Sequence, residues 1–227
     1  MNYIRRIRLP HLYNLRDLGG YEKKDGDSTK WHRLYRSDCP DMLEDEEWQR
    51  LRELDIRTLI DLRSSFEIAV RPVKPPSDFT YLHMPFIYEK AEDLSSTHMA
   101  ARKFMESVSN TYPVMFENSL ENVKEIISAI YEKQKDGAVM FFCTAGKDRT
   151  GIIAAVYLLS EGVCNEDIIA DYSVTELYNI DEVRRRIEAM PKAYLDRLSD
   201  EQIGALCKSN PEKMHEFLDF IQTKKVI

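Results

Sequence analysis

The stretch from Ala138 to Leu159 reads A-V-M-F-F-C-T-A-G-K-D-R-T-G-I-I-A-A-V-Y-L-L. It joins an apolar run, a short polar loop and a second apolar run without a break. The first run is typical of a strand buried on both faces, and the run after Gly151 is typical of a buried helix. A loop between a strand and a helix directs backbone N–H groups and the positive end of the helix dipole to one point. The stretch therefore predicts an α/β fold with an anion site directly after Cys143.

Shorter patterns on both sides of this stretch agree with that fold class. Strand-like runs precede it at 33–36, 56–62 and 79–84. Helical patterns occur at 43–54, 100–135 and, in several pieces, 165–227. Alternation of strands and helices favours a parallel sheet covered by helices. We expect one domain over residues 1–227, with a four-to-five-stranded, mainly parallel sheet flanked by helices and a mostly helical C-terminal third.

The composition excludes several classes of protein. The chain has 227 residues, 43% of them hydrophobic, and 32 Lys and Arg against 39 Asp and Glu, for a net charge of −7. It is too apolar for a disordered chain, and it lacks the basic excess of a general nucleic-acid binder. Four cysteines without a Cys-x-x-Cys pair indicate reduced thiols rather than a disulfide scaffold. With no signal-peptide pattern and no apolar run of roughly 20 residues, we expect a cytoplasmic protein without stable membrane insertion.

Cys143 and Arg149 stand at the two ends of the loop in the pattern Cys-x5-Arg, which the other three cysteines lack. The positive field of the loop favours the thiolate of Cys143, which is the nucleophilic form. Arg149 can turn its planar guanidinium over the loop and hold two phosphate oxygens. The hydroxyl of Thr150 can stabilise the sulfur as a leaving group. The remaining candidates for phosphate binding are the loop residues Thr144, Ala145, Gly146 and Lys147.

The loop C-T-A-G-K-D-R-T-G, residues 143–151, resembles the signature of Cys-dependent protein phosphatases. The resemblance is to the atypical bacterial tyrosine phosphatase family with its mycobacterial PtpB-like and listerial LipA-like members. Further blocks resemble this family in the same order: N-L-R-D-L-G-G (14–20), L-Y-R-S-D (34–38), L-I-D-L-R-S (59–64) and D-Y-S-V-T (171–175). The resemblance implies a four-stranded parallel sheet among helices and hydrolysis of phosphate esters without a metal or cofactor. It also implies activity on phosphotyrosine, with phosphoserine/threonine and phosphoinositides as substrates of some members.

The leaving group of such a reaction needs a proton, which many cysteine phosphatases supply from an Asp on a separate upstream loop. This chain has no Asp between Leu94 and Lys135 and no Trp-Pro-Asp sequence. Asp148 lies within the loop itself, and the resembling family is thought to use this position. We expect Asp148 to act first as the acid and then as the base, with Asp61 and Asp17 as alternatives.

Charged residues in the other blocks are expected to support the loop. Arg16 and Asp17 could form one ion pair, and Arg63 could brace Asp61 in another, as structural supports rather than substrate contacts. Lys147 adds a second positive charge to the loop. Its family counterpart implies broad specificity that includes inositol phosphates.

Phe142 departs from the family pattern, in which a His usually precedes the cysteine. Because that His helps to hold the loop and the thiolate, we expect an active enzyme with a more alkaline pH optimum. Three alternatives stay open: a phosphoinositide-preferring phosphatase, a phosphate-binding pseudophosphatase, and sulfur transfer on a rhodanese-like loop.

Other features add weaker expectations. The five histidines show no metal-ligand spacing, so we assign no metal. The pair Tyr112-Pro113 predicts a turn, Tyr172 is expected in the core or at a rim, and residues 97–110 could form a flap. The family's extended tail does not follow Ile227, so the sequence does not predict whether a lid covers the site.

Overall fold

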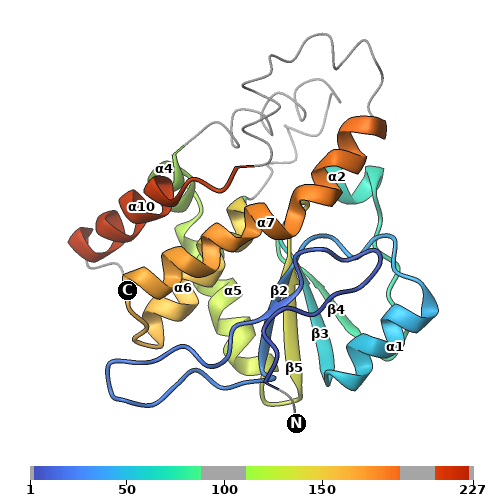
Figure 1. Cartoon of the computed structure of the whole chain (residues 1–227), viewed down its shortest axis with the longest axis horizontal. Helices are drawn as coiled ribbons and strands as arrows, with labels where there is room; N and C mark the ends of the chain where they lie inside the picture. The colour runs from blue at the N-terminus through green and yellow to red at the C-terminus, as the bar shows by residue number, and fades with distance from the viewer. Residues whose placement is uncertain (1–2, 88–110, 190–207, 225–227) are drawn as a thin grey trace.

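The computed structural model describes residues 3–87, 111–189 and 208–224, with side chains described outside 180–189. Its centre is a five-stranded sheet with the strand order β1-β2-β5-β3-β4 (Figure 1). Strand β1 pairs with β2 in antiparallel fashion, and the other four strands are parallel to one another. The bounds are β1 Arg16–Asp17, β2 Leu34–Ser37, β3 Ile56–Asp61, β4 Thr80–His83 and β5 Ala138–Phe142. The expected α/β class and mainly parallel sheet are confirmed, and β1 is an additional edge strand.

Helices cover both faces of this sheet (Figure 1). They are α1 Asp45–Glu53, α2 Ser65–Val70, α4 Tyr112–Glu117, α5 Leu120–Lys133, α6 Asp148–Ser160, α7 Asn165–Ala189 and α10 Pro211–Lys224. Helices α6, α7 and α10 confirm the helical C-terminal part of the chain. Among the described residues, no helix is long and apolar enough to cross a bilayer.

The helical pattern over 100–135 corresponds to two helices, α4 and α5, in its described part. The predicted turn at Tyr112-Pro113 is wrong, because these residues open α4 with proline in its first turn. Proline is favoured there, since its missing N–H has no partner at a helix start and its φ already suits the helix. The flap predicted over 97–110 lies outside the described residues.

Two apolar clusters hold the layers together, one on each face of the sheet. The first gathers side chains from α4, α5, α6, α7 and α10, and the second gathers side chains from α1 and the N-terminal segment. Strand β5 contributes to both, since Val139 and Phe141 point to the first cluster and Met140 and Phe142 to the second. Each large side chain buried in this way contributes about 1.5–3 kcal/mol. The loop that follows β5 is therefore anchored to the best-buried part of the fold.

Candidate active site

The predicted anion-binding loop follows β5 at the carboxyl ends of the parallel strands, the usual place for ligands in open α/β sheets. Cys143 is the first residue after β5, and it is 3% exposed. Residues 144–147 lead from there into α6. Because β5 lies between β2 and β3, the ends of both neighbouring strands border the loop (Figure 1).

The carbonyl groups of residues 144–146 are held by residues outside the loop, and that of residue 147 by the first turn of α6. The Nδ2 atom of the buried Asn14 donates to the carbonyl oxygens of Ala145 (3.3 Å) and Gly146 (2.9 Å). The other donors are Cys39 N to Thr144 (3.3 Å), Asn179 Nδ2 to Ala145 (2.5 Å), Arg36 Nη2 to Gly146 (2.9 Å) and Gly151 N to Lys147 (2.8 Å). The C=O and N–H of one peptide unit point in opposite directions. The N–H groups of Ala145, Gly146 and Lys147 therefore point away from the donors that hold the preceding carbonyl groups.

Gly146 lets the loop lie directly against the end of β2. Its φ is +64°, which a side chain disfavours, and a Cβ atom would lie 2.4 Å from the carbonyl oxygen of Ser37. No side chain fits at that distance without a shift of the backbone. The glycine predicted as part of the phosphate loop is thus required by the packing of the loop.

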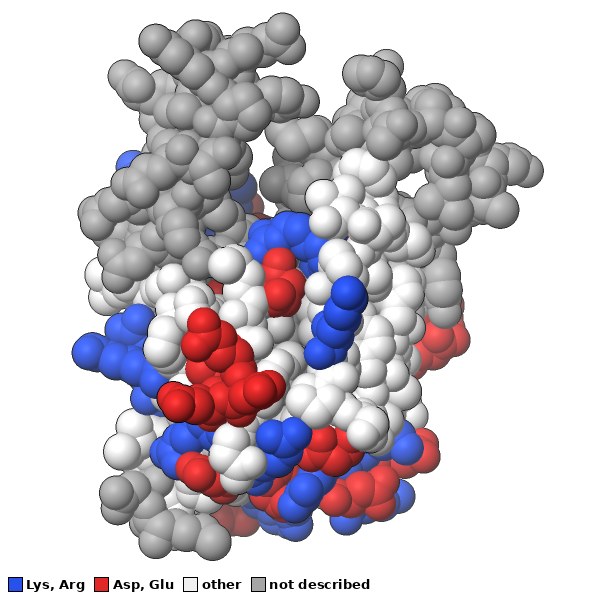
Figure 2. Space-filling model, turned by 90° about the vertical axis from the view of Figure 1, so that its right-hand side faces the viewer, with Lys and Arg blue, Asp and Glu red and all other residues white. Residues whose placement is uncertain are grey.

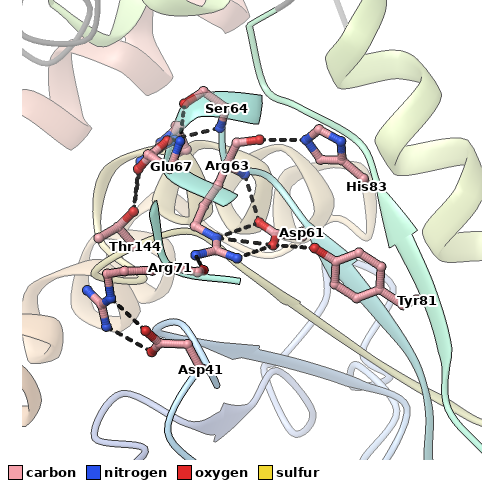
Figure 3. A network of polar contacts seen from close by, with 10 residues as sticks. Asp41, Asp61, Arg63, Ser64, Glu67, Arg71, Tyr81, His83 and Thr144 are labelled. Atoms are coloured by element: carbon pink, nitrogen blue, oxygen red, sulfur yellow. Dashed lines mark hydrogen bonds and ion pairs between the residues drawn. The ribbon is translucent and has the colours of Figure 1, made fainter. Parts of the chain in front are cut away.

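Arg149 is held by a carboxylate on a different element. Its Nη1 and Nη2 atoms donate to Oε2 and Oε1 of Glu67 on α2, at 2.6 and 2.8 Å. The Thr144 hydroxyl donates to the same carboxylate (Figure 3). Burial alone would raise the pKa of Glu67, but the hydrogen bond and charge of Arg149 lower it to about 2. Burial alone would lower the pKa of Arg149, but Glu67 and the Cys143 sulfur together raise it above its ordinary value. Arg149 is therefore a permanent cation in a fixed position.

The start of α2 positions Glu67. Ser64 is the N-cap, and its hydroxyl accepts a hydrogen bond from the Glu67 N–H at 3.2 Å. The Glu67 carboxylate accepts in return from the Ser64 N–H at 2.9 Å, which completes a capping box (Figure 3). The same carboxylate thus caps α2 and binds Arg149.

The predicted pair of Arg63 and Asp61 is confirmed, and it lies just before this cap. The two side chains are buried and 2.6 Å apart, and Tyr81 donates a further hydrogen bond of 2.7 Å to Asp61 (Figure 3). Arg63 also donates to the carbonyl oxygen of Arg71, at the end of α2, at 2.7 Å. The pair of Arg63 and Asp61 therefore supports α2. The carboxylate of Asp61 is already bound by Arg63 and Tyr81, which argues against Asp61 as the acid.

The predicted pair of Arg16 and Asp17 is wrong. Arg16 binds Asp171 of α7 instead, with Nε 2.8 Å from Oδ1. Asp17 accepts from the backbone N–H groups of Gly19 and His32, both at 2.8 Å. Arg16 and Asp17 are neighbours in an extended strand, so their side chains point to opposite faces of the sheet. The alternation of a strand therefore rules out the pair, and Asp17 is a buried turn support rather than an acid.

A buried cluster of Arg16, Arg36 and Asp171 lies behind the loop. An Asp171 oxygen lies 2.5 Å from Arg36 Nη1. Burial alone would raise the pKa of Asp171, but the two guanidinium groups lower it further than burial raises it, so Asp171 stays ionised. Arg36 in turn donates to the carbonyl oxygen of Gly146. The cluster thus links α7 and two strands to the loop.

The remaining predicted residues lie around the start of α6. Asp148 accepts a hydrogen bond of 2.6 Å from the phenol of Tyr112. Lys147 Nζ donates to the carbonyl oxygen of Lys208 at 3.3 Å, and it lies 3.9 Å from an Asp148 oxygen. The hydroxyl of Thr150 is buried and makes no hydrogen bond within the described part of the chain. Nor do the described residues contain a group of three or more potential ligands arranged around a metal position.

A family model described as the tyrosine phosphatase family matches residues 7–225. The chain belongs to the tyrosine phosphatase family. A candidate tyrosine-protein phosphatase of Cupriavidus necator is 30% identical over 71% of this chain and 59% of its own length. A tyrosine-protein phosphatase of Nostoc commune is 33% identical over 60% of this chain and 46% of its own length. The triple specificity protein phosphatase PtpB of Mycobacterium tuberculosis is 27% identical over 83% of this chain and 75% of its own length.

The chain spans about half the length of the first two relatives. Among solved structures, the crystal structure of P. aeruginosa TpbA matches 74% of this chain and 77% of its own, with 16% identity and a TM-score of 0.42. A likeness this distant adds nothing to the family assignment.

Phe142 and Cys143 lie on opposite faces of the sheet. The ring of Phe142 is part of the apolar cluster on the α1 face, and Cys143 is part of the cluster on the other face. Phe142 is fully buried, and the guanidinium of Arg63 lies 5.8 Å from its ring centre. Residue 142 therefore acts on the sulfur only through the backbone and the framework below the loop. The more alkaline pH optimum expected from this position stays a prediction.

Sequence reasoning overlooks three residues of this tyrosine phosphatase family site: Glu67, Tyr112 and Arg36. A signal exists for Glu67, because S-S-F-E over 64–67 has the spacing of a capping box. Nothing local marks Tyr112, which lies 36 positions from Asp148. Arg36 stands in the block L-Y-R-S-D, but nothing local indicates its contact with Gly146, 110 positions away. These contacts depend on how the elements pack.

Proposed function

We propose that the protein is a protein tyrosine phosphatase that hydrolyses phosphate monoesters through a phosphocysteine intermediate. The observation that carries this proposal is the loop itself. The carbonyl groups of Thr144, Ala145 and Gly146 are bound by residues outside the loop, and Arg149 is held in place by Glu67. In our proposal the N–H groups of the same peptide units surround the phosphoryl group next to Cys143. Such an arrangement stabilises the equatorial oxygens of a phosphoryl group during transfer.

In the first step, the thiolate of Cys143 attacks phosphorus, a P–S bond forms and the bond from phosphorus to the ester oxygen breaks. Asp148 gives its proton to that oxygen, so the alcohol leaves neutral. In the second step, water attacks phosphorus, Asp148 takes up a proton from the water, and the sulfur departs as thiolate. The hydroxyl of Thr150 supports this step, because it is buried next to the loop and makes no hydrogen bond among the described residues.

Phosphotyrosine in proteins is the substrate that we propose first. Phosphoserine/threonine and phosphoinositides come second, supported by the positive charge of Lys147 and by the resemblance to PtpB, whose name describes triple specificity. The 27% identity over 83% of the chain also supports a place in the PtpB-like group. We further propose that residues 1–227 form one catalytic domain that works in the reducing cytoplasm, since Cys143 must stay a free thiol to react.

A substrate panel tests this function. The wild-type protein and Cys143→Ser are assayed with phosphotyrosine peptides, phosphoserine/threonine peptides and phosphoinositides. We expect the wild type to release phosphate from phosphotyrosine peptides and Cys143→Ser to bind them without turnover. Binding without turnover by both proteins would show a pseudophosphatase, and faster turnover of phosphoinositides would make these the main substrate class.

A further inference from the structure

We propose that Tyr112 is a positioning residue, which holds Asp148 in the orientation needed for proton transfer. The inference rests on the proposed function and concerns the same site. The two residues come from different elements, because Tyr112 opens α4 and Asp148 opens α6. Their contact is a short hydrogen bond of 2.6 Å from the phenol oxygen to Oδ1.

The ring of Tyr112 is fixed from several sides. It is 3% exposed, and it packs edge-on against Tyr172 of α7 and Phe217 of α10, with ring centres 5.9 and 6.2 Å apart. Phe116, one turn further along α4, packs on the same Phe217 at 5.4 Å. The phenol oxygen therefore has little freedom to move away from Asp148.

The phenol group has a defined hydrogen-bond direction. Burial and the charge of Asp148 raise the pKa of Tyr112 well above its ordinary value, so the phenol keeps its single proton. That proton is donated to Asp148, and the oxygen of Tyr112 lies 2.6 Å from the hydroxyl of Tyr172. Because Tyr112 has no second proton, Tyr172 must be the donor in that contact. The chain of donors runs from Tyr172 through Tyr112 to Asp148.

This direction assigns different tasks to the two carboxyl oxygens of Asp148. Oδ1 of the ionised carboxylate accepts from Tyr112, so in our proposal the acid proton is carried by the other oxygen, Oδ2. Oδ2 makes no hydrogen bond among the described residues, its nearest cation being Lys147 at 3.9 Å, and the side chain is 30% exposed. Tyr112 thus keeps Oδ2 available for the proton that goes to the leaving group and returns from water.

Tyr112→Phe removes the hydroxyl and keeps the ring contacts with Tyr172 and Phe217. We compare this variant, Asp148→Asn and the double variant on phenyl phosphate and on para-nitrophenyl phosphate, whose leaving group needs little protonation. We expect Asp148→Asn to lower kcat on phenyl phosphate by about a hundredfold and Tyr112→Phe to lower it by about tenfold. Both losses should be much smaller on para-nitrophenyl phosphate, with KM unchanged. In the Asp148→Asn background, Tyr112→Phe should cause no further loss.

Tyr131→Phe is the matched control, because its phenol also donates to a carboxylate, Glu161, at 2.7 Å but lies outside the site. It should leave the kinetics unchanged. If Tyr112→Phe does not fold, Tyr172→Phe replaces it. The loss of kcat should again be larger on phenyl phosphate than on para-nitrophenyl phosphate, but both losses should be smaller than those expected for Tyr112→Phe. Equal losses on both esters, or a further tenfold loss in the Asp148→Asn background, would overturn the inference while leaving the phosphatase activity in place. Turnover by Cys143→Ser would instead contradict the proposed function.

Discussion

Asp148 and Arg149 are adjacent in the chain and opposite in charge, yet their side chains bind partners on different elements. Asp148 accepts from Tyr112 of α4, and both terminal nitrogens of Arg149 donate to Glu67 of α2. The short helices α2 and α4 thus each fix one of these two side chains, and the proposed mechanism uses both. At the scale of single residues, the proposed site therefore depends on Glu67 and Tyr112 as well as on Cys143, Asp148 and Arg149.

Glu67→Gln tests the pair of Glu67 and Arg149. The pKa of Glu67 falls from 4.5 to about 2 on folding, so its ionisation stabilises the fold. This stabilisation is complete above about pH 5 and is lost as the pH falls towards 2. We expect wild type to exceed Glu67→Gln in free energy of unfolding by about 3 kcal/mol at pH 7, and the difference to shrink between pH 5 and pH 2.

Urea unfolding at a series of pH values measures this difference. The KM for a phosphotyrosine peptide should rise in the same variant, because Arg149 loses the carboxylate that orients it. A stability difference that stays constant from pH 7 to pH 3 would show that the carboxylate of Glu67 is not the stabilising group.

At the scale of the elements, the loop between β5 and α6 has its shape set by the end of β2. Gly146 lies so close to Ser37 that a Cβ atom would be 2.4 Å from its carbonyl oxygen. Asn14, Cys39 and Arg36 then bind the loop carbonyls from the same side. The proposed oxyanion site therefore depends on how β2 and the segment before β1 border the loop.

Gly146→Ala should destabilise the protein by more than about 2 kcal/mol, because it combines a disfavoured positive φ with a backbone clash. Gly26→Ala is the matched control, since Gly26 also has a positive φ, of 83°, but no atom lies within 4 Å of its Cβ position. It should cost about 1 kcal/mol and leave activity intact. Thermal unfolding and phosphatase assays compare the two, and an equal effect would contradict the close approach of the loop to β2.

The sequence predicts the parts of the site that are contiguous in the chain. Cys143 and the loop follow a buried strand, and Arg149 lies in the first turn of a buried helix, so hydrophobic pattern and spacing are sufficient to locate them. Tyr112-Pro113 shows the limit, because the same pair of residues suits a turn or the first turn of a helix. The partner of Arg16 could not be predicted either, since Asp171 lies 155 positions away and only the packing of α7 brings it there.

At the scale of the whole molecule, the net charge of −7 is compatible with the proposed anion site, because charges are balanced locally. On the described part of the face shown in Figure 2, basic and acidic residues are interspersed. In the interior, Arg16 and Arg36 share Asp171, and Arg63 has Asp61. The described arginines of the interior are thus paired with carboxylates, and the described surface in that view mixes both signs of charge.

Asp171→Asn tests how far this internal balance supports the fold. The substitution leaves two buried guanidinium groups without their carboxylate, which should lower the free energy of unfolding by about 3–5 kcal/mol. Asp78→Asn is the control, because it breaks the exposed pair with Arg52 and should leave the unfolding midpoint nearly unchanged. Chemical denaturation measures both, and an Asp171→Asn variant as stable as the wild type would show that the cluster does not support the fold.

The central claim is that Cys143 takes up the phosphoryl group, and rapid-quench mass spectrometry tests it most directly. Wild-type protein is mixed with a phosphotyrosine peptide, quenched with denaturant within a single turnover, and digested. We predict that one phosphoryl group is found on the peptide that contains Cys143, that it appears faster than free phosphate, and that Cys143→Ser does not acquire it. Release of phosphate by the wild type with no phosphoryl group on Cys143 at any time would contradict the account.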